Sequence, residues 1–278
     1  MTSPADPVLG STETGLAELL TLERIEDNLF RSVLVTKRPV GLFGGQVAAQ
    51  ALRAAAETVP AGRRPHSLHG YFLSPGDPSR RVLLTVSRDR DGGSYSGRRV
   101  IAVQNGVVIF NMAASFHVTE DGADFQAPAA PLVRAPEDVP DDPRWHRAHG
   151  VQVRLPEQPN PGQQRPSRLW VRSRFALSGD TLHACALAYI SDMFTGLAAI
   201  PRASLSAPLT SLDHAVWFYR QHAFDDWVLM DLQPESAAGG RGMYTGRIFS
   251  RDGTLVAGLA QETLFRPAQA GLNPRERQ

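Results

Sequence analysis

The sequence has almost no cysteine and no long apolar run. Cys185 is the only cysteine among 278 residues, so neither an internal disulfide nor a metal site built from several thiolates can form. It lies in the stretch LHACALAYI, where we expect a buried thiol rather than a nucleophile. No segment reaches 18 consecutive apolar residues, the length of a spanning helix. We therefore expect no membrane insertion and, without clustered ligands, neither a metal nor a cofactor.

The chain also lacks an excess of charge of either sign. Its 29 basic and 28 acidic residues give a net charge of +1, and the basic ones are scattered, which disfavours nucleic acid and anionic membranes as partners. The first residues, MTSPADPVLGSTETG, do not combine a basic segment with an apolar one, and the last four, RERQ, are not a peroxisomal address. These features predict a cytoplasmic protein.

The length and the 42% hydrophobic content allow two domains of similar size. Each half shows the same order: a strand, an apolar helix and four strands. The helices are predicted over residues 42–60, opened by two glycines and stopped by proline, and over 182–201. Residues 120–144 are rich in Pro, Ala and Asp without periodicity. We predict an N-terminal domain over 1–119, a linker over 120–144 and a C-terminal domain over 145–278.

The two halves match in detail. Placing Asn105-Gly106 on Asp252-Gly253 gives an offset of 147 residues, which also brings Gly92-Gly93 onto Gly239-Gly240. Together with the repeated order of elements, these matches support a duplicated domain. A long central helix wrapped by an antiparallel sheet is the hotdog pattern. We therefore predict the α+β class and a double hotdog, with two such domains in tandem.

The stretch from Leu209 to Pro267 is predicted to be an antiparallel meander of four strands. Its last strand, 254–265, is apolar on both faces except at Gln261. A buried amide without partners costs roughly 1–3 kcal/mol, so Gln261 must be hydrogen-bonded. Its partner is either neighbouring backbone or a functional group.

Seven stretches, taken in order and spacing, resemble the acyl-CoA thioesterase II family over nearly the whole chain outside the termini and the linker. They are FGGQVAAQAL, HSLHGYFLSPGD, RDGGSYSGRRVIAVQNGVVIF, AYISDMF, SLDHAVWFYR, GGRGMYTGRIFSRDG and LVAGLAQETLFR. The resemblance implies a double hotdog that hydrolyses medium- or long-chain fatty acyl-CoA to free fatty acid and CoA. It also implies a polar trio of Asp192, Ser211 and Gln261, although the family more usually carries Thr where Ser211 stands.

The residues themselves are compatible with this trio. Asp192 follows an apolar run, where a carboxylate needs hydrogen bonds or a raised pKa; alternatively it caps a short helix after a break at Ser191. Ser211 is expected on the same strand face as Asp213, and alone it would be an ordinary strand residue. As a set, the three side chains could hold and activate a water that attacks the thioester carbon.

Backbone N–H groups at Gly44 and Gly45 could bind substrate by receiving an oxyanion, although glycines there could equally serve tight helix packing. Arg241 could meet the phosphates of CoA. His69 and His214 are predicted to be hydrogen-bonded core histidines. Ser94 and Ser96 lie outside a Gly-x-Ser-x-Gly elbow, which argues against a serine nucleophile.

Two other functions remain open: a hotdog hydratase or dehydratase acting on enoyl-CoA, and a protein that binds acyl-CoA without turnover. No histidine follows Asp192 at short range, which disfavours the hydratase. At the offset of 147, Gln261 falls on Ala114 and Asp192 falls on Gly45, so we predict one working site per chain. We also expect a homodimer or a higher even-numbered oligomer.

Overall fold

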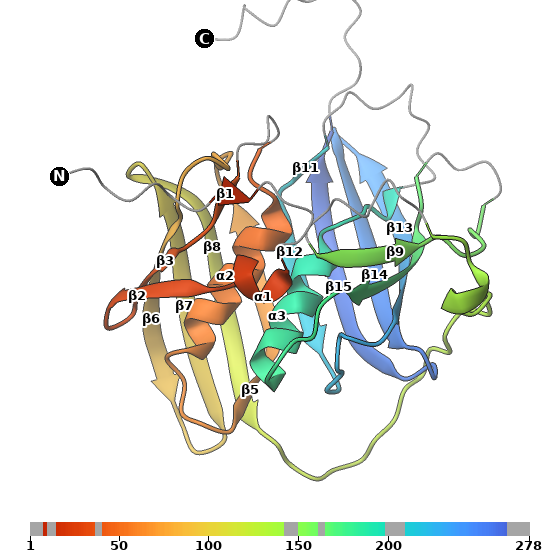
Figure 1. Cartoon of the computed structure of the whole chain (residues 1–278), viewed down its shortest axis with the longest axis horizontal. Helices are drawn as coiled ribbons and strands as arrows, with labels where there is room; N and C mark the ends of the chain where they lie inside the picture. The colour runs from red at the N-terminus through yellow and green to blue at the C-terminus, as the bar shows by residue number, and fades with distance from the viewer. Residues whose placement is uncertain are drawn as a thin grey trace, which may run out of the picture.

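The computed structural model describes residues 8–9, 15–36, 41–141, 150–160, 165–197 and 209–265. Two helices, α2 (Gly44–Ala56) and α3 (Asp180–Ser191), lie side by side against one large curved sheet (Figure 1). Along the sheet the strands are β2 (Leu22–Glu26), β3 (Leu29–Ser32), β6 (Leu83–Asp91), β7 (Tyr95–Gln104), β8 (Val107–Val118), β5 (Arg63–Phe72), β12 (Asp213–Phe218), β15 (Leu255–Leu264), β14 (Arg241–Ser250), β13 (Val228–Ala238), β10 (Arg168–Ser173) and β9 (Val151–Arg154).

Five short elements complete the described fold. β11 (Thr210–Ser211) also pairs with β15, and β1 (Val8–Leu9) pairs with β4 (Val35–Thr36) in a separate small sheet. The helix α1 (Leu16–Leu19) precedes β2. The 3₁₀ helix η1 (Pro136–Asp138) follows β8 and precedes β9 in the sequence.

The sheet repeats the same arrangement on each side of its middle. From the outer edge inward, β2, β3, β6, β7, β8 and β5 correspond to β9, β10, β13, β14, β15 and β12. The halves join where β5 and β12 pair antiparallel, with His69 opposite Ala215. This pairing removes an open edge from each half. The prediction of an α+β double hotdog is therefore confirmed.

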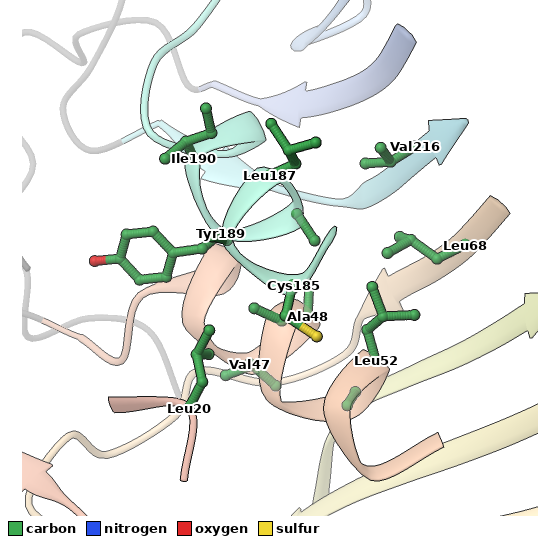
Figure 2. Packing of buried hydrophobic residues seen from close by; sticks show 14 of the residues in the cluster. Leu20, Val47, Ala48, Leu52, Leu68, Cys185, Leu187, Tyr189, Ile190 and Val216 are labelled. Carbon is green, nitrogen blue, oxygen red and sulfur yellow. The ribbon is translucent and has the colours of Figure 1, made fainter. Parts of the chain in front are cut away.

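Small residues allow the two central helices to pack closely. A Cβ atom at Gly45 would lie 2.4 Å from the carbonyl oxygen of Tyr189, so only glycine fits there. Ala48 and Cys185 are fully buried and face one another between the helices (Figure 2). Burial raises the pKa of the Cys185 thiol to about 12, which confirms the prediction of an inert core cysteine.

The meander predicted over Leu209–Pro267 is wrong at its first strand. Only β13, β14 and β15 follow one another as neighbours, whereas β12 pairs with β15 and β5. An apolar run shows that a strand is buried but does not name its neighbour. Here the pairing that seals the junction between the halves takes precedence over the pairing of consecutive strands.

The second helix is shorter than predicted. It ends at Ser191 and does not extend through residues 192–197, and Pro201 lies outside the described residues. Asp192 is the residue that caps its C-terminus, with φ −100° and ψ 3°. Beyond it the chain passes closely over β14, because a Cβ atom at Gly196 would lie 2.5 Å from Cβ of Tyr244. Contact with the sheet thus replaces the expected last turns.

The described part of the predicted linker packs against the C-terminal half. The Gln126 side chain accepts a hydrogen bond from the Leu255 N–H (2.8 Å) and donates one to the Gly253 carbonyl (3.0 Å). Val139 packs in a small separate cluster with Trp170. This segment is therefore ordered along the start of β15, while the domain boundaries at 119 and 145 stay a prediction.

Candidate active site

An extra residue in one strand turns Ser211 toward the helices. Ser211 pairs with Thr263 and Ala215 pairs with Ala260, so four steps along one strand match three along the other. Such a bulge changes the face on which the following side chains lie. Ser211 therefore shares the interior face with Gln261, and its predicted position beside Asp213 on one strand face is wrong.

The three predicted catalytic side chains come together. Ser211 Oγ donates to Asp192 Oδ1 at 3.0 Å, and Gln261 Nε2 donates to the same Oδ1 at 2.8 Å and to Ser211 Oγ at 2.5 Å. The carboxylate comes from the end of α3, the hydroxyl from β11 and the amide from β15. The amide nitrogen at position 261 is thus bonded to the Asp192 and Ser211 side chains instead of neighbouring backbone.

The second carboxylate oxygen of Asp192 faces the start of α2. A Cβ atom at Gly44 would lie 2.6 Å from Asp192 Oδ2, so glycine is needed for the two helix ends to meet. Within the described residues, Oδ2 has no hydrogen-bond partner. One oxygen of the carboxylate is therefore held by the trio and the other is available to a small molecule.

The trio lies between two cavities that share Asp192, Leu209 and Ser211. The first, of about 680 Å³, has a largely apolar wall made by Leu42, Phe43, Val47, Phe72, Ile109 and Phe110. The second, of about 440 Å³, is lined by more polar groups and includes Gln261 and Thr263. An amphipathic molecule spanning both cavities would place its middle atoms at the carboxylate.

The residues predicted to bind substrate differ in position. Gly44 lines the larger cavity. Gly45 does not line either cavity and instead touches Tyr189, as tight packing requires. Arg241, at the start of β14, is more than half exposed, pairs with Glu262 at 2.8 Å and lines neither cavity.

The two histidines also differ. His69 is exposed and meets the ring of Trp217 edge-on at 5.2 Å, so its prediction as a core residue is wrong: its face of β5 points away from the helices. His214 is buried, and its Nε2 lies 2.7 Å from Ser191 Oγ. Its prediction as a hydrogen-bonded core histidine is confirmed. Burial is the main cause that lowers the pKa of His214 and keeps the ring neutral.

One residue of the site was missed by sequence reasoning. Tyr244 is opposite Gln261 in the β14–β15 pairing, lines the smaller cavity and donates a hydrogen bond from its hydroxyl to the Phe194 carbonyl at 3.2 Å. Burial first, and then the negative charge of Asp192, raise the pKa of Tyr244, so the phenol stays protonated. The sequence could have identified Tyr244, because it is the cross-strand partner of Gln261 in the predicted hairpin.

The described part of the N-terminal half contains no second trio. Counting from the matching irregularity in β5, Pro65 occupies the position of Ser211 and Ala114 that of Gln261. The correspondence of Ala114 follows the prediction, but that of Gly45 with Asp192 is wrong. Gly45 begins α2, whereas Asp192 follows the end of α3. Offsets read from a hairpin do not extend to helices because the connecting loops differ in length.

The place of the missing trio is filled by a structural ion pair. Arg98 is opposite Ala114 as Tyr244 is opposite Gln261. The Arg98 guanidinium is fully buried and donates to the hydroxyl and carbonyl of Thr58, just beyond α2, and to Asp91. A buried charge with this many partners is well satisfied. The carboxylate that caps α2, at Glu57, is exposed and pairs with Arg53.

In the described ranges, no three His, Cys, Asp or Glu side chains are grouped as a metal site would require. The same part of the chain contains no helix long and apolar enough to cross a membrane.

Comparison with known proteins agrees with this architecture. Residues 36–117 match the family model of the acyl-CoA thioesterase N-terminal domain, and residues 126–265 match that of the C-terminal domain. The chain is 35% identical to acyl-coenzyme A thioesterase 8 of Rattus norvegicus, over 90% of this chain and 88% of the relative. It is 34% identical to acyl-CoA thioesterase 2 of Haemophilus influenzae, over 90% of this chain and 96% of the relative.

Solved structures show the same likeness. The acyl-CoA thioesterase II TesB2 of Mycobacterium marinum is 40% identical and superposes with a TM-score of 0.78, covering 93% of this chain and 99% of that chain. A hotdog-fold protein of unknown function from Alicyclobacillus acidocaldarius, at 21% identity, has a TM-score of 0.76 over 92% of this chain and 98% of that chain. The latter supports the fold alone.

Fold and comparisons together define a thioester hydrolase of the hotdog class. The chain belongs to the acyl-CoA thioesterase family, in which both halves of the double hotdog are recognised. Its substrate is therefore an acyl-CoA, which it hydrolyses to a carboxylic acid and CoA.

Proposed function

We propose that Asp192, Ser211 and Gln261 are the catalytic residues of this hydrolase and that they activate a water molecule. In this mechanism Asp192 accepts a proton from water through Oδ2, while its other oxygen is fixed by the Ser211 hydroxyl and the Gln261 amide. The hydroxide attacks the thioester carbon, and the tetrahedral intermediate collapses to the acid as the C–S bond breaks. The released thiolate takes up the proton. Positioning and general base catalysis supply the rate.

We assign the oxyanion of the intermediate to the N-terminus of α2. The N–H groups of Gln46 and Val47 both donate to the Phe43 carbonyl, so the N–H groups before them, at Gly44 and Gly45, are those that the first turn leaves without a partner inside the helix. Gly44 also lines the cavity beside Asp192. Donors at a helix N-terminus stabilise developing negative charge. Gly45 serves this role only through its backbone.

The two cavities supply a direction for the substrate. The larger cavity, walled by Val47, Phe72 and Ile109, suits the acyl chain, and its volume of about 680 Å³ supports a medium- or long-chain group. The smaller and more polar cavity suits the CoA arm. Arg241 precedes Gly242, which is opposite Thr263 of the smaller cavity, and in this proposal it meets the CoA phosphates outside.

The observation that carries the mechanism is the closed set of hydrogen bonds among three side chains from three elements beside an apolar cavity. The hydratase alternative needs a histidine at the substrate. The nearest candidate, His214, is buried and lines neither cavity. The other alternative, binding of acyl-CoA without turnover, would release no free thiol.

Release of free thiol tests all three functions. Purified protein is incubated with saturated acyl-CoAs of graded length, with and without a chelator, and with an enoyl-CoA. The proposal expects thiol release that peaks at medium or long chains and does not depend on added metal. Hydration of the enoyl-CoA without thiol release would contradict it, as would binding alone. Activity lost to the chelator and restored by zinc would refute the metal-free mechanism.

We also propose self-association. The outer face of the central strands exposes Tyr71, Trp217 and Tyr219, which are 59%, 36% and 54% exposed. Exposed aromatic side chains gathered at a sheet face commonly mark a protein contact. A second copy of the chain would cover this face, so a homodimer or a higher even-numbered oligomer stays our prediction, as does a cytoplasmic location.

A further inference from the structure

A histidine lies directly behind the catalytic amide. Ala215 is paired with Ala260, and beyond this pair the extra residue of the bulge places both Asp213 and His214 opposite Gln261, with His214 on the interior face. Directly opposed residues have Cβ atoms about 4.5–5.5 Å apart. Both side chains are buried, with exposures of 1% and 3%.

The other half of the molecule shows that this polar pair is not needed by the fold. The position of His214 is occupied there by Leu68 and that of Gln261 by Ala114, and these two residues are paired across β5 and β8. Both are buried and apolar. The imidazole and the amide are therefore present together in the half with the trio and absent together from the half without it.

Hydrogen-bond accounting gives the direction of the contact. Both hydrogens of the Gln261 amide are used, one toward Asp192 and one toward Ser211. Its Oε1 and His214 Nδ1 are both buried, and among the described residues neither atom has a hydrogen-bond partner that meets the usual geometry. The Gln261 side chain favours a proton on the His214 ring. A proton on Nδ1 satisfies both atoms, whereas a proton on Nε2 alone would leave two buried lone pairs facing each other.

The far side of the ring is compatible with this tautomer. His214 Nε2 lies 2.7 Å from Ser191 Oγ, which also lies 2.8 Å from the Ala188 carbonyl. A serine hydroxyl has one proton, which can go to either neighbour. When Nδ1 carries the ring proton and donates to Gln261 Oε1, the Ser191 hydroxyl donates to Nε2, so that Ser191 Oγ, both ring nitrogens and Gln261 Oε1 are all paired.

We propose that His214 is a positioning residue that donates from Nδ1 to Gln261 Oε1 and thereby fixes which end of the amide faces Asp192 and Ser211. An amide can rotate by half a turn with little change in shape. In the rotated state Oε1 would face the carboxylate and the hydroxyl would lose its donor. The histidine removes that state. The inference rests on the trio mechanism proposed above and adds a residue that touches neither water nor substrate.

Three substitutions at one position test this role. Asn can keep a donor near the place of the imidazole Nδ1, Gln places its amide near the site of Nε2, and Leu matches Leu68 in the other half. We expect His214→Leu and His214→Gln to lower kcat by about 10- to 100-fold, the loss expected for one buried hydrogen bond to an unsatisfied partner, with KM within about twofold. His214→Asn should recover at least fivefold of that loss. Unchanged kcat in His214→Leu, or better recovery by Gln than by Asn, would overturn the proposal.

A double-mutant cycle separates this role from general support of the fold. If the histidine acts through the amide, His214→Leu should have almost no further effect on kcat in a Gln261→Ala background. Multiplicative losses would mean an independent effect and would refute the inference. If Gln261→Ala alone leaves kcat unchanged, the trio mechanism itself fails. The two failures are therefore distinguishable.

The wild-type protein supplies a measurement that does not depend on the folding of variants. With ¹⁵N-labelled histidine, the ring nitrogen shifts report which nitrogen carries the proton, and the His214 signals are those missing from His214→Asn. We expect a neutral ring protonated at Nδ1. A neutral ring protonated at Nε2 would contradict the proposed hydrogen bond.

Discussion

A Cβ atom at Gly44 would lie 2.6 Å from Oδ2 of Asp192, although the two residues belong to different halves of the chain. The contact exists because the first turn of α2 meets the last turn of α3. One half therefore contributes the backbone beside the carboxylate and the other half contributes the carboxylate. The proposed active site is built by both hotdogs, even though the three proposed catalytic side chains come from one.

Replacing Asp192 by Asn should lower kcat by about 10² to 10⁴, the range expected when a general base is lost. The fold should be kept, because Asn can still accept the hydrogen bonds that reach Oδ1. Steady-state thiol release measures the effect. The matched control is Asp213→Asn, whose oxygen can still accept the bond from the Glu262 N–H and should leave kcat nearly unchanged. Normal turnover in a folded Asp192→Asn protein would leave the residue with a capping role only.

Removing the Ser211 hydroxyl by Ser211→Ala should reduce kcat by about 10- to 100-fold, since a hydrogen bond to a charged group contributes roughly 1.5–3 kcal/mol. Ser211→Thr keeps the hydroxyl and adds a methyl group that restricts its rotamers, so its kcat should stay within about threefold of the wild type. Equal losses in the two variants would assign the effect to packing instead of the hydroxyl.

Enlarging Val47, which lines the larger cavity, should shorten the accepted acyl chain. In Val47→Phe we expect kcat/KM for long-chain acyl-CoA to fall at least tenfold relative to a short-chain substrate, because added atoms occupy space otherwise filled by the chain. The ratio is measured across a series of saturated acyl-CoAs. A uniform loss at every length would show that the chain lies elsewhere.

One site should operate in each chain. The double variant Asp192→Asn, Gln261→Ala is tested under single-turnover conditions with enzyme in excess. Because Arg98 fills the equivalent place in the N-terminal half, thiol release should fall to a background level far below half of the wild-type rate. A residual rate near one half would reveal a second competent site.

Self-association should depend on the exposed aromatic face. At micromolar concentration we expect light scattering to give an even multiple of 30.3 kDa. Trp217→Arg should lower that mass, since it replaces an apolar contact with a charge that must stay hydrated. A wild-type protein with the mass of a single chain would refute the assembly, and an unchanged mass in the variant would move the contact to another face.

The repeat was readable from the sequence because each half carries its own helix and hairpin turns, and those patterns are local. The strand that pairs with β12 could not be predicted from the sequence, because its pairing with β5 depends on how the two halves of the chain dock. The trio was found through resemblance, and its residues gave only compatible chemistry. The turn that aims Ser211 at Asp192 depends on one extra residue in a strand, which alternation of polar and apolar residues does not reveal.

The role of His214 shows the same limit more sharply. Sequence reasoning placed it correctly in the core from its position in a strand next to aromatics, although the same reasoning was wrong for His69. Its partner could be named only after the register of β12 against β15 was known. A shift of one residue would have put His214 on the outer face with Trp217.

The pairing of β5 with β12 also has a consequence for biosynthesis. Gly70 of β5 pairs with His214 of β12, which is synthesised about 140 residues later. At roughly 5–20 residues per second, the inner edge of the first sheet stays open on the ribosome for about 7 to 30 seconds. During that interval a neighbouring nascent copy offers the same kind of edge and could pair in place of the missing strand. Slow translation of the second half would therefore be expected to increase swapped or aggregated product.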